Sequence, residues 1–373
     1  MKIAVNGAYI QEQASGLGVV TSNTIDKLIN LEKKYDFLIY SYAEYFKKLY
    51  PNNTISVTKA IAPDRGFSGH IKRLLWYQTI LSWQLKKNQT ALFYSPASEG
   101  MLFPTVPQIV TVHDLIPLKY PEVSPKWRYY YLYILPLILK NSQQIISISQ
   151  HTKQDLIKTY HLKPESIQVV YNGFDRDLFF PQPDPKIIQK YNLERYLLYV
   201  GDMRFYKNLD RCLAAFDTLP FKDYQFVITG KKDDFFYPKL KNKVENLAAK
   251  DRIIFLDYVP IDDLPGLYSM AQCLVFASLY EGFGLPVLEA MACGCPVIAS
   301  NSTSIPEVGG DSVFYVDPHD KDDIARGMHR MLTDENLRQT LSDRGKSRAK
   351  LFSWDNTARE IGSIIDEQLT TNN

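Results

Sequence analysis

The chain has 373 residues, 45% hydrophobic and 23% charged, with a formal net charge of +2. This length predicts two domains of ordinary size, and the globular composition without repeats or low-complexity tracts excludes a disordered or fibrous protein. Residues 1–180 carry 20 Lys and Arg against 13 Asp and Glu, whereas the remainder carries 23 against 28. The basic first half predicts an anionic partner, but no nucleic-acid motif accompanies the charge, so nucleic acid is not expected.

Cysteine usage and hydropathy predict a protein without disulfides and without a membrane span. Cys293 and Cys295 bracket a glycine, and no second Cys or His pair stands near enough to complete a zinc site. The chain opens directly on a predicted strand, without a signal-peptide pattern. Its most hydrophobic run, residues 129–139, is too short to cross a bilayer. We expect a cytoplasmic protein with buried free thiols, at most peripheral to a membrane.

The first half starts with a predicted strand at residues 3–5, a glycine loop and a helix at residues 19–31. Gly16 and Gly18 fit the start of a dinucleotide-binding G-x-G-x-x-G motif, but Thr21 occupies the third glycine position, which argues against a nicotinamide enzyme. Further strands are predicted at residues 91–95, 108–112, 145–148 and 168–171. The pattern is that of an α/β domain with a parallel sheet.

His113 and Asp114 directly follow the predicted strand at residues 108–112. A histidine at the carboxyl end of a parallel strand is well placed for chemistry, although a lone histidine is about as often structural. The residues around it leave both interpretations open. Ser149 is a candidate cap for the helix that follows the next strand.

Two stretches of the first half combine basic and aromatic residues, at residues 70–87 and 126–131. Cationic helices that carry Trp can lie in a membrane interface. The alternative is an ordinary half-buried helix with solvated lysines. Peripheral association with an anionic membrane is therefore a hypothesis.

The second half follows a linker at residues 181–186 and repeats the α/β pattern. A strand at residues 196–200 leads into a loop with Gly201, Arg204 and Lys207, and Lys207 can reach a diphosphate bound at a neighbouring loop. A strand at residues 225–229 ends at Gly230 and Lys231. Another, at residues 253–256, leads into residues 257–260, which include Val259.

The most informative stretch is residues 273–299, which read as strand, glycine loop, short helix and strand. Pro286 is expected at the start of the helix, and Gly294 just beyond its end. The amides at that helix start, on Phe283, Gly284 and Leu285, lack partners within the helix and suit a phosphate. Glu281 and Glu289 flank the site, and carboxylates accept hydrogen bonds from sugar hydroxyls. For an isolated pair, a solvated loop residue and a helix-dipole partner would be the simpler interpretation.

The run Glu281-Gly282-Phe283-Gly284-Leu285-Pro286-Val287-Leu288-Glu289 resembles the donor-binding signature of the retaining GT-B glycosyltransferases of family 4, also called group 1. His113-Asp114, the turn Asn172-Gly173-Phe174-Asp175 and Lys207-Asn208 resemble further motifs of that family. Ser15 stands where that family usually has a further glycine next to Gly16, and Asp202 stands where several relatives have a basic residue.

The resemblance implies a role for each matching residue. Glu281 would hold hydroxyls of the donor sugar, Glu289 the ribose, and Lys207 the diphosphate, with Arg204 a weaker candidate. The backbone of Val259 would face the base, and His113 would lie beside the anomeric centre. The expected donor-binding set is Gly16, Gly18, Arg204, Lys207, Gly230, Lys231, Val259, Glu281, Gly282, Phe283, Gly284, Leu285 and Glu289, with His113, Glu281 and Lys207 catalytic.

The implied fold is α/β, of the GT-B type: two doubly wound Rossmann-like domains facing a cleft, at residues 1–180 and 187–351. A C-terminal helix at residues 352–373 would return to the first domain. The implied activity is retaining, metal-independent transfer of a hexose from a nucleotide sugar, without a cofactor, to a glycan or lipid-linked acceptor in polysaccharide assembly. UDP-glucose is the leading donor and GDP-mannose a close second. A sugar phosphorylase or epimerase and a non-catalytic nucleotide-sugar-binding partner are the alternatives.

Overall fold

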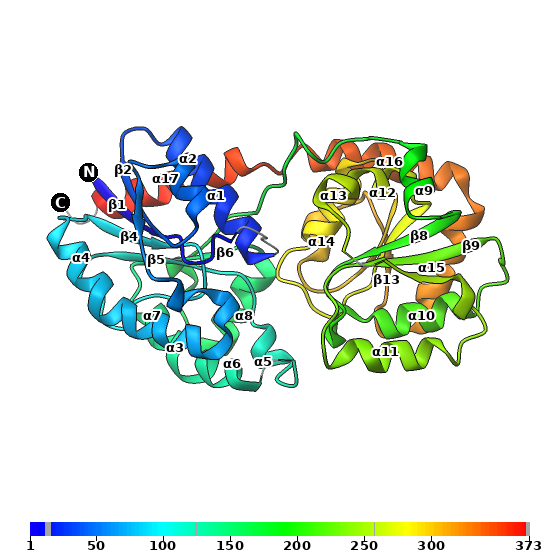
Figure 1. Cartoon of the computed structure of the whole chain (residues 1–373), viewed down its shortest axis with the longest axis horizontal. Coiled ribbons are helices and arrows are strands. Elements are labelled where there is room, and N and C mark those ends of the chain that lie inside the picture. The colour runs from blue at the N-terminus through cyan, green and yellow to red at the C-terminus, as the bar shows by residue number, and fades with distance from the viewer. Residues whose placement is uncertain (12–15, 124, 257, 371–373) are drawn as a thin grey trace. The chain divides into compact units, whose positions relative to one another are not determined.

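The computed structural model describes residues 1–11, 16–123, 125–256 and 258–370. They form two compact units (Figure 1). Unit 1 comprises Met1–Gly173 together with the C-terminal segment from Trp354, and unit 2 comprises Phe174–Ser353. Each unit is described by itself.

Unit 1 contains a seven-stranded parallel sheet in the order β3-β2-β1-β4-β5-β6-β7. Its central strands are buried on both faces, which explains why they read as continuous apolar runs. The strands are β1 (Lys2–Asn6), β2 (Asp36–Ser41), β3 (Thr54–Ser56), β4 (Leu92–Ser95), β5 (Gln108–Val112), β6 (Gln144–Ser147) and β7 (Ile167–Val169).

Helices cover both faces of this sheet, and alternate strand residues separate the two cores. Tyr94 and Ile109 point into one core, and Phe93 and Val110 into the other side. The first face carries α1 (Leu17–Leu31), α2 (Glu44–Leu49) and α17 (Trp354–Thr370). The second carries α3 (Gly66–Trp76), α4 (Ser82–Lys87), α6 (Pro125–Tyr129), α7 (Leu135–Lys140) and α8 (Gln150–Tyr160), while α5 (Ile116–Lys119) follows β5. Because α17 packs on α1, the C-terminal helix returns to the first unit.

Unit 2 contains a six-stranded parallel sheet in the order β10-β9-β8-β11-β12-β13. Its strands are β8 (Arg195–Val200), β9 (Tyr224–Thr229), β10 (Ile253–Phe255), β11 (Cys273–Phe276), β12 (Val297–Ser300) and β13 (Phe314–Val316). Its helices are α9 (Pro185–Lys190), α10 (Leu209–Asp217), α11 (Phe236–Val244), α12 (Leu264–Met270), α13 (Leu285–Ala292), α14 (Ile305–Gly309), α15 (Lys321–Thr333) and α16 (Glu335–Ala349). Both sheets are doubly wound, which confirms the predicted fold class.

The predicted strands and helices all occur, with small shifts at their ends, and Ser149 caps α8 by accepting from the amide of Thr152. Three strands were not predicted: β2, and the three-residue edge strands β3 and β13. All four cysteines are buried and free, as expected. Within the described ranges, no helix combines the length and the apolar character that crossing a bilayer requires.

Candidate functional site

In unit 2, the order of the strands reverses between β8 and β11, so that the loops after these two strands flank the switch point of the sheet. Ligands of open α/β sheets bind in the crevice at this point, outside the carboxyl ends of the strands. The loop after β8 carries Lys207, and the loop after β11 carries Glu281. The two loops are joined directly, because the Leu279 amide donates to the Tyr206 carbonyl at 2.8 Å.

Lys207 and Glu281 form an ion pair at this switch point. Lys207 Nζ donates to Glu281 Oε1 at 2.7 Å, and both side chains are largely buried. Burial disfavours the ammonium form, but the Glu281 carboxylate outweighs it, and the pKa of Lys207 is raised above its ordinary value. The ammonium has three donor hydrogens and the carboxylate several acceptor sites, so each keeps capacity for a ligand after forming the pair.

The loop between Glu281 and α13 has the conformation that the glycines suggest. Gly284 has φ of +119°, and a Cβ there would lie 2.7 Å from Ile305 Cδ1, so the position requires glycine. The Ser304 hydroxyl contacts the Glu281 and Phe283 carbonyls at 2.9 and 3.0 Å. Pro286 stands in the first turn of α13, and Gly294 follows its end with φ of +75°, both as predicted. The positive end of α13 therefore faces the same edge of the sheet as the ion pair.

Glu289 lies on α13, half-buried, and accepts a hydrogen bond from the Tyr268 hydroxyl at 3.1 Å. Burial raises its pKa to about 7, and the Tyr268 bond opposes that shift only in part. Tyr268 comes from α12 and was not predicted as a site residue. Tyr268 and Glu289 lie on different helices, so no spacing motif in the sequence predicts their contact.

The other predicted donor residues of unit 2 lie around these loops. Gly230 has φ of +138°, and a Cβ there would overlap the Gly201 carbonyl oxygen at 2.1 Å, so the loops after β8 and β9 touch through glycine. Arg204 is 3.8 Å from Asp233 and 3.9 Å from Asp202 rather than beside Lys207. Lys231 is exposed and Val259 half-buried, and the structure gives neither side chain a contact with the ion pair.

In unit 1, His113 follows β5 and its orientation is fixed by the backbone. Its Nε2 lies 2.8 Å from the Pro96 carbonyl, an acceptor, so Nε2 carries the proton and Nδ1 is the acceptor nitrogen. Burial lowers the pKa of His113 to about 4, which keeps the ring neutral near pH 7. Asp114 caps the next turn by accepting from the Ile116 amide at 2.9 Å. A small cavity beside His113 is lined by Thr24, Thr111 and Asn172, among others.

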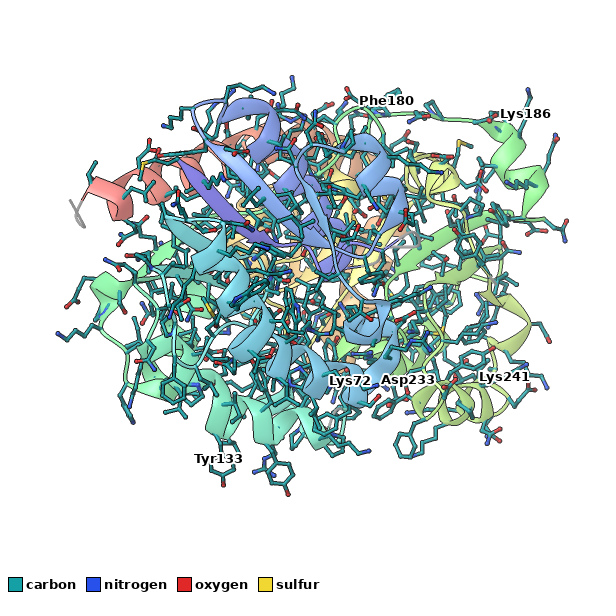
Figure 2. The ribbon with its side chains drawn as sticks, turned by 60° about the vertical axis from the view of Figure 1, so that its left-hand side comes forward. Lys72, Tyr133, Phe180, Lys186, Asp233 and Lys241 are labelled. Atoms are coloured by element: carbon teal, nitrogen blue, oxygen red, sulfur yellow. The ribbon has the colours of Figure 1, made fainter. Side chains whose placement is uncertain are left out.

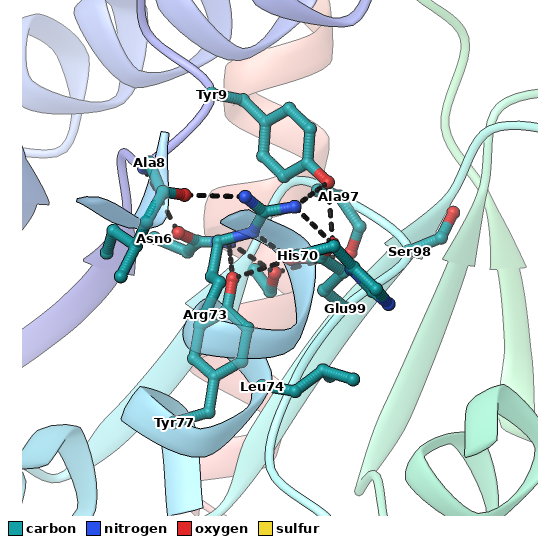
Figure 3. A network of polar contacts seen from close by, with 12 residues as sticks. Asn6, Ala8, Tyr9, His70, Arg73, Leu74, Tyr77, Ala97, Ser98 and Glu99 are labelled. Atoms are coloured by element: carbon teal, nitrogen blue, oxygen red, sulfur yellow. Dashed lines mark hydrogen bonds and ion pairs between the residues drawn. The ribbon is translucent and has the colours of Figure 1, made fainter. Parts of the chain in front are cut away.

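The switch point of the unit 1 sheet, between β1 and β4, holds a buried charged network that sequence reasoning missed (Figure 3). Glu99, from the loop after β4, accepts from Arg73 through both of its oxygens at 2.5 and 2.6 Å. Glu99 also contacts Tyr9, His70 and Tyr77 at 2.7, 2.7 and 3.1 Å. Although burial favours the neutral acid, Arg73 holds the pKa of Glu99 well below its usual range.

Other predicted residues lie outside this constellation. Gly16 is exposed and Gly18 buried, at the start of α1, whereas Ser15 and Asp257 lie outside the described residues. Asp175 accepts from the amides of Asp177 and Leu178 and so caps its own turn. Among the residues that the structure describes, no group of three or more His, Cys, Asp or Glu could hold a metal ion.

The sequence matches two family models that together span most of the chain. The model described as "Glycosyltransferase Family 4" matches residues 14–178, and "Glycosyl transferases group 1" matches residues 182–348. The chain is 35% identical over 260 residues to the O-antigen chain mannosyltransferase B of Escherichia coli, which covers 66% of this chain and 67% of the relative. It is 28% identical over 330 residues to the O-antigen chain mannosyltransferase RfbU of Salmonella typhimurium, covering 87% and 88% of the two chains.

Solved structures share the fold over nearly the full length. Sucrose-phosphate synthase from Thermosynechococcus elongatus superposes with a TM-score of 0.78 at 21% identity, covering 100% of both chains. HepE from Anabaena, in complex with UDP and glucose, superposes with a TM-score of 0.76 at 18% identity, covering 98% of this chain and 100% of that one. At these identities the similarity concerns the fold, which is the GT-B fold.

Proposed function

Because the chain belongs to the family 4, or group 1, glycosyltransferases, we propose that it transfers a hexose from a nucleotide sugar to a glycan or lipid-linked acceptor in O-antigen or related polysaccharide assembly. The observation that carries this proposal is the Lys207–Glu281 pair at the switch point, beside the amino end of α13. It brings a cation, a helix dipole and a hydroxyl acceptor to one edge of the sheet, as a sugar diphosphate requires.

The donor's diphosphate binds the amino end of α13, and the free hydrogens of the Lys207 ammonium donate to its oxygens. Glu281 accepts from hydroxyls of the sugar, and Glu289 from the ribose. Because Gly230 and Gly201 have no side chains, the phosphates can approach the backbone of the loops after β8 and β9. Val259 faces the base. Gly16 and Gly18 bring backbone toward the same phosphates. Arg204, which the structure places near two aspartates, contributes less than Lys207.

The reaction proceeds with retention and without a metal. An acceptor hydroxyl forms the new bond to the anomeric carbon on the face from which the diphosphate leaves, and its proton passes to the departing phosphate oxygen. Negative charge develops on that leaving group, and Lys207 together with the α13 dipole stabilises it. His113 stays neutral and accepts a hydrogen bond from the sugar through Nδ1, because Nε2 is held by Pro96.

Mannose is the sugar that the relatives favour, because two of the most similar ones are mannosyltransferases. GDP-mannose therefore moves ahead of UDP-glucose, the donor first expected. The enzyme works in the cytoplasm at the inner face of a membrane, where lipid-linked acceptors are exposed. A phosphorylase, an epimerase or a silent binding partner would use a similar site without transfer to an acceptor.

A panel of nucleotide sugars tests the proposal, since a ligand that binds only the folded state raises the melting temperature. We expect a shift with GDP-mannose larger than with UDP-glucose, and slow hydrolysis of the bound donor. Turnover with free phosphate would instead indicate a phosphorylase, and binding without hydrolysis or transfer a silent partner.

A further inference from the structure

The helical run α3–α4 of unit 1 buries an arginine and a histidine beside its core residues and leaves large apolar side chains exposed. Arg73 and His70 are 1% exposed, whereas Leu75 is 61% and Trp83 59% exposed. An ordinary surface helix turns its charges outward and its apolar side chains toward the core. Here the Glu99 network provides partners for the inward Arg73 and His70 (Figure 3), while large apolar side chains lie exposed among the lysines of the outer side.

A second run, α6–α7, also leaves large apolar and aromatic side chains exposed. Tyr129 and Tyr133 are each 65% exposed and Leu137 is 48% exposed. Tyr133 points away from the unit (Figure 2). The inner residues of this run make their contacts within the protein. Leu135 is buried, and the Tyr130 hydroxyl donates to the Ser98 carbonyl at 2.7 Å.

The two runs cover the same face of the sheet and touch one another. Their inner residues pack on Phe93 and Val110, which share one side of the sheet. The His70 and Trp127 rings are 4.1 Å apart, and Lys126 Nζ lies 5.8 Å from the centre of the Phe67 ring. We call the outward side of α3–α4 and α6–α7 the outer face.

The charge on the outer face has one sign. No Asp or Glu occurs between Asp64 and Glu99, or between Glu122 and Asp155. Exposed cations lie toward the ends of the two runs, at Lys86, Lys87, Lys126, Arg128 and Lys140, and Lys72 is exposed within α3. Apolar and aromatic centres between basic ends are the pattern of surfaces that rest on a membrane interface.

We propose that the outer face docks on a bilayer surface with anionic headgroups, its aromatic and aliphatic side chains entering the headgroup region and its cations facing lipid phosphates. Binding to a nucleic acid would not bury the exposed apolar side chains of Leu75 and Leu137. Binding to a second copy of this chain would bring like charges together across the contact. The outer face is the surface through which the enzyme would reach the membrane location proposed above, and its role rests on that part of the proposed function. It does not depend on sugar transfer.

The test is co-sedimentation of the full chain with phosphatidylcholine vesicles, with and without an equal part of phosphatidylglycerol, at low and high salt. We expect binding to the anionic vesicles only, weakened by salt. Leu75→Ser and, independently, Trp83→Ser should each weaken it by about tenfold or more. Leu49→Ser is the matched control, because Leu49 is 60% exposed beside Lys47 and Lys48 on α2, outside the outer face, and it should leave binding unchanged.

The charge prediction has its own control. Replacing Lys86 and Lys87 by Gln should weaken binding by about twenty-five-fold, given about fivefold per cation, whereas the same change at Lys47 and Lys48 should have little effect. Protein that stays in the supernatant, equal losses for Leu75→Ser and Leu49→Ser, or self-association through the outer face would each overturn the proposal. Donor-induced thermal stabilisation, measured without vesicles, should be the same in all these variants, so that failure of membrane docking is distinct from failure of donor binding.

Discussion

Lys207 Nζ lies 2.7 Å from Glu281 Oε1, so the two groups proposed to hold the diphosphate and the sugar already neutralise one another in the free enzyme. The pair joins loops that are 74 residues apart in the sequence. In the proposed complex, donor binding adds hydrogen bonds to charges that are already in place, which limits the reorganisation that the reaction requires.

A double-mutant cycle separates the two roles of this pair. Lys207→Met or Glu281→Gln alone leaves a largely buried charge without its partner and should destabilise unit 2 by about 3 kcal/mol, whereas the double variant should recover part of that loss. Urea unfolding measures the stability. Because we propose that Lys207 also stabilises the leaving group, Lys207→Met should lower the transfer rate by about a hundredfold in either background. Lys222→Met, an exposed lysine in the same unit, is the control. Additive stabilities would contradict the pairing.

Glu289 should release a proton when the donor binds near pH 7. Its pKa of about 7 reflects burial, and ribose hydroxyls donating to the carboxylate would favour the ionised form. Donor affinity should therefore rise with pH between about 6 and 8. Calorimetry in buffers of different ionisation enthalpy measures the released fraction, about half a proton at pH 7 if the bound group is fully ionised. The Glu289→Gln variant should release none. Equal proton release by both proteins would contradict the assignment.

The sequence predicted the loops of this site well because each motif is local. Neighbouring residues determine each feature of this loop. Gly284 has a positive φ, Pro286 stands in the first helical turn and Glu289 follows one turn later. The partners of these residues were not predictable in that way. Tyr268 reaches Glu289 from another helix, and Glu99 reaches Arg73 from the loop after β4.

The same limit explains the α3–α4 run. Its period predicted a cationic helix, either half-buried with solvated charges or lying at an interface. Lys72 is solvated, but Arg73 is buried, because Glu99 supplies its counter-charge from a distant strand end. The short edge strands β3 and β13 were missed because three residues carry too little periodicity.

His113 should stay neutral throughout the pH range in which the enzyme works. Its folded pKa of about 4 lies below the unfolded value of about 6.5, so its contribution to stability is complete above pH 6.5 and is lost as the pH falls toward 4. The wild type should therefore lose about 3 kcal/mol more than His113→Gln over that interval. Thermal unfolding at a series of pH values measures the difference. Parallel curves for the two proteins would contradict the neutral ring.

Two glycines of the predicted donor set should respond differently to alanine. At Gly230, φ is +138° and a Cβ would meet the Gly201 backbone at 2.1 Å, so Gly230→Ala should cost about 3 kcal/mol or more and weaken donor binding. At Gly16, φ is +50° and ψ is −111°, but nothing lies within 4 Å of a Cβ, so Gly16→Ala should cost about 2 kcal/mol through backbone strain alone. Chemical denaturation measures both costs. Similar losses at the two sites would contradict the close approach of the loops.

The Glu99 network should dominate the stability of unit 1. Glu99→Gln leaves the buried Arg73 without its counter-charge and should cost about 3–5 kcal/mol. Removal of the exposed Lys27–Asp355 pair by Lys27→Gln should cost less than about 1 kcal/mol. Because the pKa of Glu99 is depressed, its contribution is complete above the ordinary carboxyl range and is lost as the pH falls below about 4.5. Equal effects of the two substitutions would show that the network contributes little.

The most direct test of the donor site is a crystal structure of the enzyme with a non-transferable nucleotide sugar. We predict that its diphosphate lies within hydrogen-bond distance of Lys207 and the amino end of α13, with sugar hydroxyls on Glu281 and the ribose on Glu289. A nucleotide bound away from these loops, or a diphosphate with no contact to Lys207, would contradict the account.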